Sequence, residues 1–332
     1  GVAVVVLEKH PDFLRDFRGD TIHPATLRVM EALGELDALL ALPHHKTHLM
    51  SLTFGERTLP AVDFTGLGPR TGFMAMMPQW DFLDFIAARA TALPGFRLLM
   101  PARATGLIDT AGRIAGLRAE TASGPVEIAA DLVVAADGRH STLRAAAGLQ
   151  PQDLGAPIDV LWFRLSRQPD ETAQSLGRIA EGLILVMLNR GDYWQIACVV
   201  PKGGAEGVRA AGLDAFRARL VRALKIAPER AAEVAGWDDV RLLDVQVDRL
   251  TRWWRPGFLA IGDAAHAMSP VGGVGINLAI QDAVAAANLL SLPLRAGRLT
   301  DADLAAVQSR RLWPERHEQG PPAGARTRKS RP

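Results

Sequence analysis

Residues 258–282 hold the densest group of residue types that could bind a large polar ligand. A short apolar run ends at Gly262 and Asp263. Gly262 allows backbone conformations that other residues avoid, and Asp263 supplies a carboxylate. A loop with almost no side chains follows, rich in glycine between residues 270 and 275. Because glycine has no side chain, backbone N–H groups in such a loop can come close to a bound molecule. The pattern favours a cofactor site, and an ordinary turn between a strand and a helix is the alternative.

A helix is expected to begin directly after this loop. From Ile276 the apolar residues recur at helical spacing as far as about Leu290. The first turn of a helix offers N–H groups without partners inside the helix, together with the positive end of the helix dipole. The elements that must position the loop are therefore this helix and the buried strand, residues 258–261, that precedes the carboxylate.

A second candidate carboxylate is Glu8, at the end of the mostly β-branched run of residues 2–7. Such a run is typical of a strand buried on both faces of a parallel sheet. A carboxylate at the end of the second strand of a dinucleotide-binding unit accepts hydrogen bonds from a ribose hydroxyl. The chain starts at Gly1, without the first strand and G-x-G-x-x-G turn of such a unit. We therefore expect either that the chain is a fragment or that Glu8 only solvates a strand end.

Short strands and helices alternate along the first half of the chain. Strands are expected at residues 49–54, 73–77, 96–100, 104–109, 114–120, 126–128 and 132–136. Pro24 and Pro78 each suit the first turn of a helix, and Ser141 is expected to cap a short helix that carries Arg144. The last strand of this series ends in Asp137-Gly138-Arg139.

The second half begins with a different pattern. Long strands are expected at 159–165, 183–188, 193–200 and 240–249, with one helix over about 205–224. These elements predict a separate, largely antiparallel sheet with one face covered. Three large aromatic residues lie in these strands, namely Trp162, Tyr193 and Trp194. They suit the wall of an apolar pocket, and packing in the core is the alternative. A final helix is expected from Thr300 or Asp301 to about Trp313.

Composition excludes several classes of function. The formal net charge is +2, but residues 309–332 hold seven basic and two acidic residues, so the rest of the chain carries a net charge of −3 and no nucleic-acid footprint. No apolar run reaches the roughly 18–20 residues that span a bilayer. The single cysteine, Cys198, lies in an apolar run and is expected to be a buried, inert thiol in a cytoplasmic protein. The histidines of residues 44–48 lack the companions of a metal site.

Two separated motifs resemble those of a known family. DLVVAADGRHSTLR (residues 131–144) and GFLAIGDAAHAMSPVGGVGINLAIQDA (residues 257–283) look like signatures of the single-component FAD-dependent monooxygenases, the aromatic-hydroxylase family with the p-hydroxybenzoate hydroxylase fold. VVVLEK and the RGDTIHPAT loop match that family's second strand and arginine loop, and the resemblance covers nearly all of residues 1–313. It implies an α/β fold, with a Rossmann-like, three-layer FAD-binding domain and a largely antiparallel substrate domain.

The resemblance also implies roles for single residues. Glu8 would hold the adenosine ribose, Arg18 would approach the ribityl chain or pyrophosphate, and Gln79 would contact the ribityl chain. Asp137, supported by Gly138 and Arg144, would serve FAD positioning and the NAD(P)H groove. Asp263, with Gly262 beside it, would bind the ribityl hydroxyls. The loop and helix start that would line the isoalloxazine ring comprise Pro270, Gly272, Gly273, Val274, Gly275, Ile276 and Asn277.

The activity implied by the resemblance is hydroxylation of a small aromatic or similar substrate. NAD(P)H would reduce FAD, and O2 would then form a flavin C4a-hydroperoxide that transfers oxygen. Pro270 and His266 are possible catalytic residues, and His23 and His266 are candidates for a base by chemistry alone. The protein is expected to be a monomer or homodimer without a metal, a nucleic-acid partner or an integral membrane segment.

The expected domains are interleaved. The FAD-binding domain is predicted to comprise residues 1–48, 78–155 and 251–313, while 49–77 join the substrate sheet, 156–250 form the substrate-binding domain and 314–332 form a disordered basic tail. Two alternatives to the monooxygenase are a reductase or dehydrogenase on the same fold and a fragment that no longer binds FAD. A third alternative, nucleic-acid binding by the basic tail, has little support, because no aromatic residues alternate with the basic residues of the tail.

Overall fold

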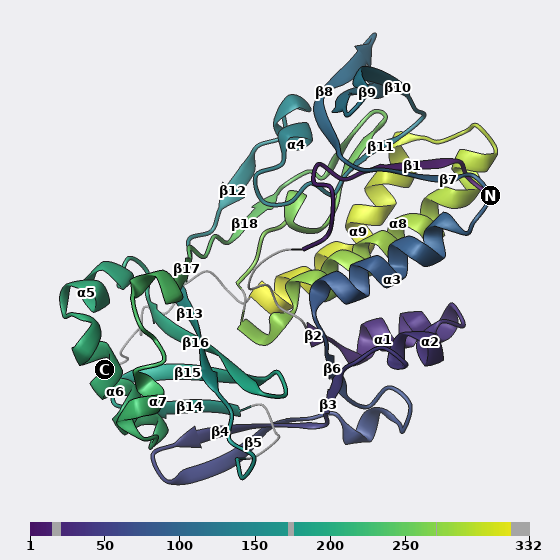
Figure 1. Ribbon diagram of the computed structural model, residues 1–332. Coiled ribbons are helices and arrows are strands. Elements are labelled where there is room, and N and C mark those ends of the chain that lie inside the picture. Colours follow the sequence, from purple (N-terminus) through teal and green to yellow (C-terminus); the bar gives the residue numbers. More distant parts are fainter. Residues whose placement is uncertain (15–20, 172–175, 270, 320–332) are drawn as a thin grey trace, which may run out of the picture. The chain divides into compact units, whose positions relative to one another are not determined.

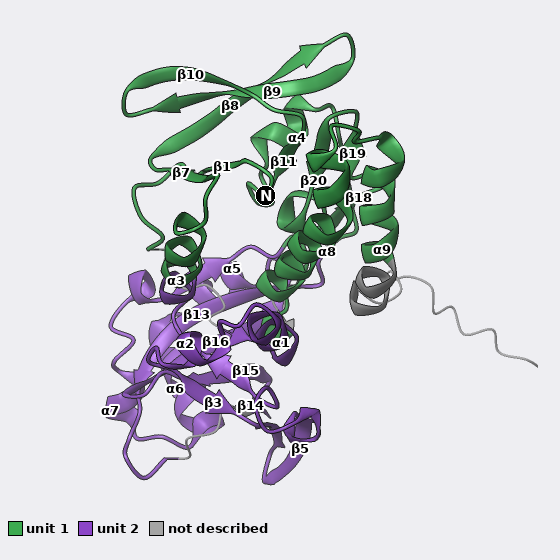
Figure 2. Ribbon diagram, turned by 90° about the vertical axis from the view of Figure 1, so that its right-hand side faces the viewer, with its two compact units in different colours: residues 1–14, 83–155, 246–332 green, residues 15–82, 156–245 purple. Residues whose placement is uncertain are grey.

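The computed structural model describes residues 1–14, 21–171, 176–269 and 271–319, without the side chains of residues 176, 271 and 313–319 (Figure 1). The chain divides into two compact units, which Figure 2 colours separately. Unit 1 comprises residues 1–14, 83–155 and 246–332, and unit 2 comprises residues 15–82 and 156–245. Each unit therefore combines stretches that are far apart in the sequence. The domain boundaries expected from the sequence stay a prediction.

Unit 1 contains two pairs of parallel strands and two long helices. Its strands are β1 (Val4–Leu7), β7 (Phe96–Leu99), β8 (Ala102–Thr110), β9 (Arg113–Thr121), β10 (Gly124–Ala129), β11 (Val133–Ala135), β12 (Pro151–Asp153), β18 (Asp248–Leu250), β19 (Trp254–Arg255) and β20 (Phe258–Ala260). Its helices are α4 (Thr142–Ala146), α8 (Gly275–Arg295), α9 (Asp301–Gln319), the short 3-10 turns η3 (Gly262–Ala264) and η4 (Val271–Gly273), and most of α3 (Gln79–Thr91). β1 pairs with β7 and β11 pairs with β20, both parallel, while β8, β9 and β10 form an antiparallel sheet.

The core of unit 1 lies around β11, β20 and the two long helices. Trp253, Phe258 and Leu259 have no exposed surface, and they share one apolar cluster with residues of α8 and α9. Figure 1 shows α8 and α9 side by side. Gln308 of α9 also accepts a hydrogen bond from the backbone N–H of Trp253 (3.1 Å), which ties this helix to the segment before β20.

Unit 2 is built on a seven-stranded sheet. In spatial order its strands are β17 (Arg241–Leu243), β13 (Ile158–Ser166), β16 (Tyr193–Pro201), β15 (Leu183–Asn189), β14 (Leu176–Ala180), β4 (Leu49–Phe54) and β5 (Arg57–Asp63). A small sheet contains β2 (Thr21–Ile22), β6 (Met74–Met76) and β3 (His45–Thr47), and the helices are α1 (Pro24–Ala32), α2 (Leu36–Leu40), η1 (Thr65–Leu67), α5 (Ala205–Ala210), α6 (Leu213–Leu224), α7 (Pro228–Ala231) and η2 (Trp237–Asp239). Every pair in the large sheet is antiparallel except β14 with β4. The predicted second, largely antiparallel sheet is confirmed.

The two faces of this large sheet are packed differently. On one face Phe163 of β13 and Phe216 of α6 are fully buried and meet edge to face, with ring centroids 5.5 Å apart. Cys198 of β16 belongs to the same cluster, and burial raises the pKa of its thiol to about 11, so the predicted buried position is confirmed. On the other face Trp162 packs with Met74 and Met76.

Four expectations about elements are wrong. The β1 residues Val4, Val5 and Val6 are 37–40% exposed, because β7 is the only strand paired with β1 among the described residues. The helix expected over 205–224 is two helices, since Gly212 takes a left-handed φ of 91° between them. Residues 240–249 form β17 and the start of β18, which belong to different sheets, instead of one strand. Helix α9 continues past Pro314 to Gln319, and the rest of the predicted tail lies outside the described residues.

Candidate functional site

The two sequence motifs meet at the ends of neighbouring strands of unit 1. β11 and β20 run parallel, with Val133 opposite Phe258 and Ala135 opposite Ala260. Their carboxyl ends therefore lie at the same edge, where open α/β sheets bind ligands. The Asp137-Gly138-Arg139 segment follows the first strand, and the Gly262-Asp263 turn follows the second.

Arginine side chains join these two segments. The Arg139 guanidinium lies 3.6 Å from the Asp263 carboxylate, which keeps about a third of its surface exposed. The buried Arg144 donates hydrogen bonds to the backbone carbonyls of Ala264 (3.2 Å) and Arg139 (2.8 Å). Asp263 is therefore held in position beside a cation, yet it stays accessible to a ligand.

The Gly262 turn requires glycine. Its φ is +58°, a left-handed conformation that other residues adopt at a cost. A Cβ atom at this position would lie 2.9 Å from the Cβ atom of Ala279, in helix α8. The strand end and the helix thus approach more closely than any side chain at position 262 allows.

We expect Gly262→Ala to lower the free energy of unfolding by about 1–3 kcal/mol, through backbone strain and contact with α8. Gly207→Ala is the matched control, because Gly207 lies inside α5 with open space around its would-be Cβ. That control should raise the stability by about 0.5–1 kcal/mol, since alanine is the better helix former. Urea unfolding followed by tryptophan fluorescence measures both variants, and a neutral Gly262→Ala would contradict the close approach.

A buried carboxylate lies beneath the turn. Asp282 of α8 has no exposed surface and accepts the backbone N–H of Gly262 (2.9 Å) and His266 Nε2 (2.7 Å) on Oδ2, and Arg311 Nε (2.6 Å) on Oδ1. Burial alone would raise the pKa of this carboxyl, but the hydrogen bonds from His266, Arg311 and Gly262 and the His266 charge outweigh it and lower the pKa. Asp282 is therefore an anion at neutral pH.

The glycine loop leads directly into α8. Gly272 and Gly273 have φ values of +80° and +63°, and the buried Asn277 side chain donates to the Gly273 carbonyl (3.1 Å). Val274 occupies the N-cap position and makes no side-chain cap hydrogen bond. A Cβ on Gly275 would meet no atom within 4 Å. Among the described residues, the start of this 21-residue helix therefore has space beside Gly275 for an anionic group.

Other predicted residues also lie at strand ends. Glu8 follows β1, and its Oε1 accepts the backbone N–H of His10 (2.9 Å). Asp137 is exposed, accepts the Ser141 hydroxyl and accepts the Leu143 N–H (3.2 Å), so it holds the start of α4. Ser141 caps α4 as expected, by accepting the N–H of Arg144 (2.9 Å).

The remaining predicted residues divide into three groups. Arg18 and Pro270 lie outside the described residues. Gln79 is the first residue of α3, and His23 is the N-cap residue of α1. His266 is 2% exposed and stacks on Trp253 with a centroid separation of 4.9 Å.

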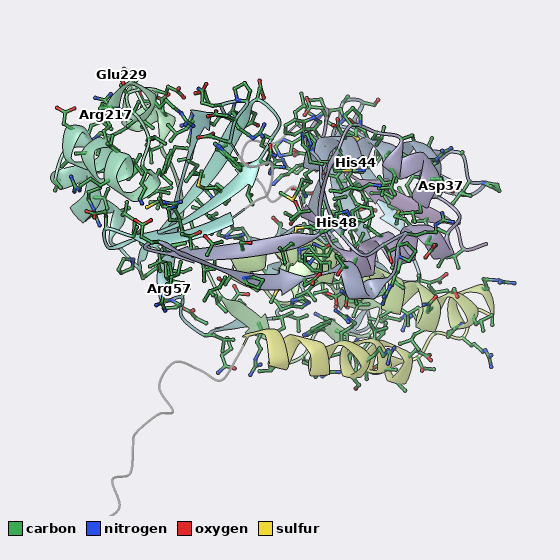
Figure 3. All side chains as sticks on the ribbon, turned by 90° about the horizontal axis from the view of Figure 1, so that it is seen from below. Asp37, His44, His48, Arg57, Arg217 and Glu229 are labelled. Carbon is green, nitrogen blue, oxygen red and sulfur yellow. The ribbon has the colours of Figure 1, made fainter. Side chains whose placement is uncertain are left out.

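The histidines near residue 44 have partners within the protein. Figure 3 labels His44 and His48. His44 Nδ1 lies 2.7 Å from the Leu42 carbonyl, and His48 Nδ1 lies 3.0 Å from the Gly72 carbonyl. Within the described part of the chain, no group of three or more His, Cys, Asp or Glu side chains could hold a metal ion.

The sequence patterns did not single out Asp282, Arg311 or Asp248. Burial raises the pKa of Asp248, and the nearby carboxylates of Asp263 and Asp153 raise it further, although the Ala267 N–H and Arg144 oppose this. The sequence feature that could have identified Asp282 is its position in the helix, because it lies four residues after the buried Leu278 and four before the buried Ala286. A charged residue in the apolar stripe of a helix indicates a buried partner.

Comparison with known proteins decides the family. The family model described as "FAD binding domain" matches residues 1–316. The chain belongs to this family. It is 32% identical over 317 residues to 6-methylpretetramide 4-monooxygenase of Streptomyces rimosus, covering 94% of this chain and 75% of that protein. It is 26% identical over 311 residues to a flavin-dependent monooxygenase of Mycobacteroides abscessus, covering 85% of this chain and 61% of the relative.

Solved structures of other proteins show the same fold. PqsL of Pseudomonas aeruginosa, described as a probable FAD-dependent monooxygenase, superposes with a TM-score of 0.79 at 24% identity, over 96% of this chain and 86% of PqsL. PqsL has also been solved in complex with 2-aminobenzoylacetate. The predicted fold class and the resemblance to FAD-dependent monooxygenases are confirmed. So are the predictions of an oxidoreductase, a flavoprotein and an FAD-binding domain.

One described helix, α8, is long and apolar enough to cross a membrane by length and composition. This is weak evidence, because core helices of globular proteins meet the same criterion. The described residues therefore contain no clear membrane-spanning segment.

Proposed function

We propose that the chain is an FAD-dependent monooxygenase that uses NAD(P)H and O2 to hydroxylate an aromatic substrate. The observation that carries this proposal is the meeting of the two motifs, where Asp263 lies beside Arg139 at the carboxyl ends of β11 and β20. The names of the monooxygenase relatives support the reaction class.

The residues of unit 1 fit FAD. A ribityl chain needs hydrogen-bond acceptors, and Asp263 offers a partly exposed carboxylate held beside a cation. An isoalloxazine edge that becomes anionic on reduction needs N–H donors, and the start of α8 offers them next to a loop of small residues. The position of Glu8 directly after β1 supports its proposed role as a ribose acceptor.

We assign the cofactor contacts to the residues inferred from the motifs. In unit 1 these are Glu8, Asp137, Gly262, Asp263, Pro270, Gly272, Gly273, Val274, Gly275, Ile276 and Asn277, and Arg18 and Gln79 complete the proposal. Bound FAD would accept hydride from NAD(P)H and would activate O2. The chain's own task is to bind the ring against the glycine loop and to stabilise negative charge there with backbone N–H groups.

The substrate is proposed to bind against unit 2, on the face of the large sheet that carries Trp162. The indole Nε1 of Trp162 is buried and has no hydrogen-bond partner among the described residues, and it lies next to the adaptable side chains of Met74 and Met76. Because Met74 and Met76 are themselves only 3% and 2% exposed, an aromatic ring with a polar substituent would have to displace these adaptable side chains before its substituent accepted from the indole. The cytoplasmic location and the oligomeric state stay predictions.

The test is turnover of the FAD-loaded chain with NADH or NADPH and a panel of phenols and other aromatic acceptors. We expect an aromatic substrate to stimulate O2 uptake and to yield a product that carries one oxygen atom from isotope-labelled O2. Rapid NAD(P)H oxidation that yields a reduced organic product and no labelled oxygen would contradict the proposal and favour a reductase on the same fold.

A further inference from the structure

The carboxylate of Asp282 collects three donors from three separate parts of unit 1. Gly262 donates from the turn after β20, His266 from the segment that follows, and Arg311 from α9. All three donor–acceptor distances lie between 2.6 and 2.9 Å. Hydrogen bonds to a buried ionised group are among the strongest in proteins. The turn therefore depends on a group in α8 that is itself held by the last described helix.

The N–H group that Asp282 accepts belongs to the turn that carries Asp263, so the network acts on the conformation of that turn. Gly262 immediately precedes Asp263, and the bond to Asp282 is the contact that holds its N–H. On the other side of the turn, Arg144 holds the Ala264 carbonyl (3.2 Å). The Ile261–Gly262 and Ala264–Ala265 peptide groups, which bracket the Gly262–Ala264 turn, are thus each held by a side chain, and this restricts the backbone conformation at Asp263 between them.

We propose that Asp282, held by Arg311 and His266, is a positioning residue that fixes the Gly262–Asp263 turn in the conformation that binds FAD. The inference rests on the proposed function, because Asp263 is assigned there to the ribityl hydroxyls. It also gives His266 a role. The ring is 2% exposed, stacks on Trp253 and directs Nε2 to Asp282, so it acts on the turn and not on the substrate.

The direct test is Asp282→Asn. An amide cannot accept from Gly262, His266 and Arg311 together, because one of its two terminal atoms is itself a donor. We expect the FAD dissociation constant, measured by quenching of flavin fluorescence, to rise about 10-fold, which is the loss of one good hydrogen bond. The Gly262 amide should also exchange faster in hydrogen-exchange mass spectrometry of the FAD-free protein.

Asp159→Asn is the matched control. Asp159 is 4% exposed, and it accepts two backbone N–H groups, from Gly203 (2.8 Å) and Val245 (3.0 Å), and the ammonium of Lys202 (2.9 Å). It therefore resembles Asp282 in burial and in donors, but it lies in unit 2. This control should lower the melting temperature, as Asp282→Asn should, while the FAD dissociation constant stays within about twofold of wild type.

A second pair of variants keeps the carboxylate. Arg311→Met removes the cation on Oδ1 and should raise the FAD dissociation constant at least about 3-fold, whereas Arg311→Lys retains the charge and should restore most of the affinity. If Asp282→Asn does not fold, this pair decides the question. Wild-type FAD affinity in Asp282→Asn, or in Arg311→Met should the first variant not fold, would overturn the positioning role.

The measurements distinguish a wrong assignment of the cofactor site from a wrong positioning role for Asp282. A wild-type chain that binds no FAD while its Gly262 amide is protected would contradict the assignment of the cofactor site. Unprotected exchange of the Gly262 amide in the wild-type chain would instead overturn the positioning role itself.

Discussion

Asp282→Ala is expected to lower the free energy of unfolding by about 3–5 kcal/mol, among the largest effects of any single substitution in unit 1. The alanine removes a fully buried acceptor and leaves the Arg311 guanidinium, itself 8% exposed, without its counterion. The Gly262 N–H loses its acceptor as well. Urea unfolding monitored by circular dichroism measures the loss in the FAD-free protein.

Asp109→Ala is the comparison for this prediction. Asp109 also pairs with an arginine of unit 1, Arg255 (2.8 Å), but its side chain is 43% exposed. Asp109 Oδ1 also accepts the backbone N–H of Gly112 (2.8 Å), and solvent screens both contacts, so Asp109→Ala should cost no more than about 2 kcal/mol. Equal losses of unfolding free energy in Asp109→Ala and Asp282→Ala would contradict the claim that burial makes the Asp282 contacts strong.

The contribution of Asp282 should also depend on pH. Its pKa is lowered from the ordinary value of 3.8, so the folded state binds this proton more weakly than the unfolded state. The stabilisation is therefore complete at pH values above the unfolded pKa, and it is lost as the pH falls below 3.8 through the folded pKa. The difference in unfolding free energy between wild type and Asp282→Asn should shrink over that range, and a difference that grows on acidification would contradict the anionic Asp282.

Asp263→Ala is expected to weaken FAD binding by about 100-fold. The carboxylate is proposed to accept two ribityl hydroxyls, and each hydrogen bond to a charged group contributes about 1.5–3 kcal/mol, so a loss near 3 kcal/mol in total is a moderate expectation. Because the Asp263 side chain is about a third exposed, the fold should tolerate the substitution. Fluorescence titration with FAD measures the affinity.

Asp131→Ala provides the control for the loss of charge. Asp131 is an exposed carboxylate of unit 1 at the start of the first motif, and its removal should leave the affinity within about twofold of wild type. An Asp263→Ala protein that binds FAD as tightly as wild type would show that the carboxylate does not contact the cofactor.

The resemblance implied that the two motifs serve one cofactor. Each motif follows a short apolar run, as the sequence indicated, but it is the direct parallel pairing of β11 with β20 that brings their carboxyl ends together. The glycine at position 262 was predictable as a turn residue for the same local reason. Its close approach to Ala279 was not, because that contact depends on how α8 packs.

The Asp282 network could not be predicted, since its donors are 16, 20 and 29 residues away along the chain. No local pattern states which distant groups meet a buried carboxylate. The break at residues 244–247 has a similar cause. The Val245 N–H donates to Asp159 (3.0 Å) and Lys202 bridges Asp159 and Asp244, so long-range polar contacts replace the strand pairing that the apolar pattern favours.

The most direct test of the flavin site is a titration of the purified chain with FAD, followed by gel filtration and a visible absorption spectrum. A site formed by the two motifs predicts that flavin fluorescence is quenched to saturation at one equivalent, and that the flavin absorption bands elute with the protein. A folded chain that elutes colourless after the same treatment would contradict the assignment of Asp263, the glycine loop and the start of α8 to a flavin site.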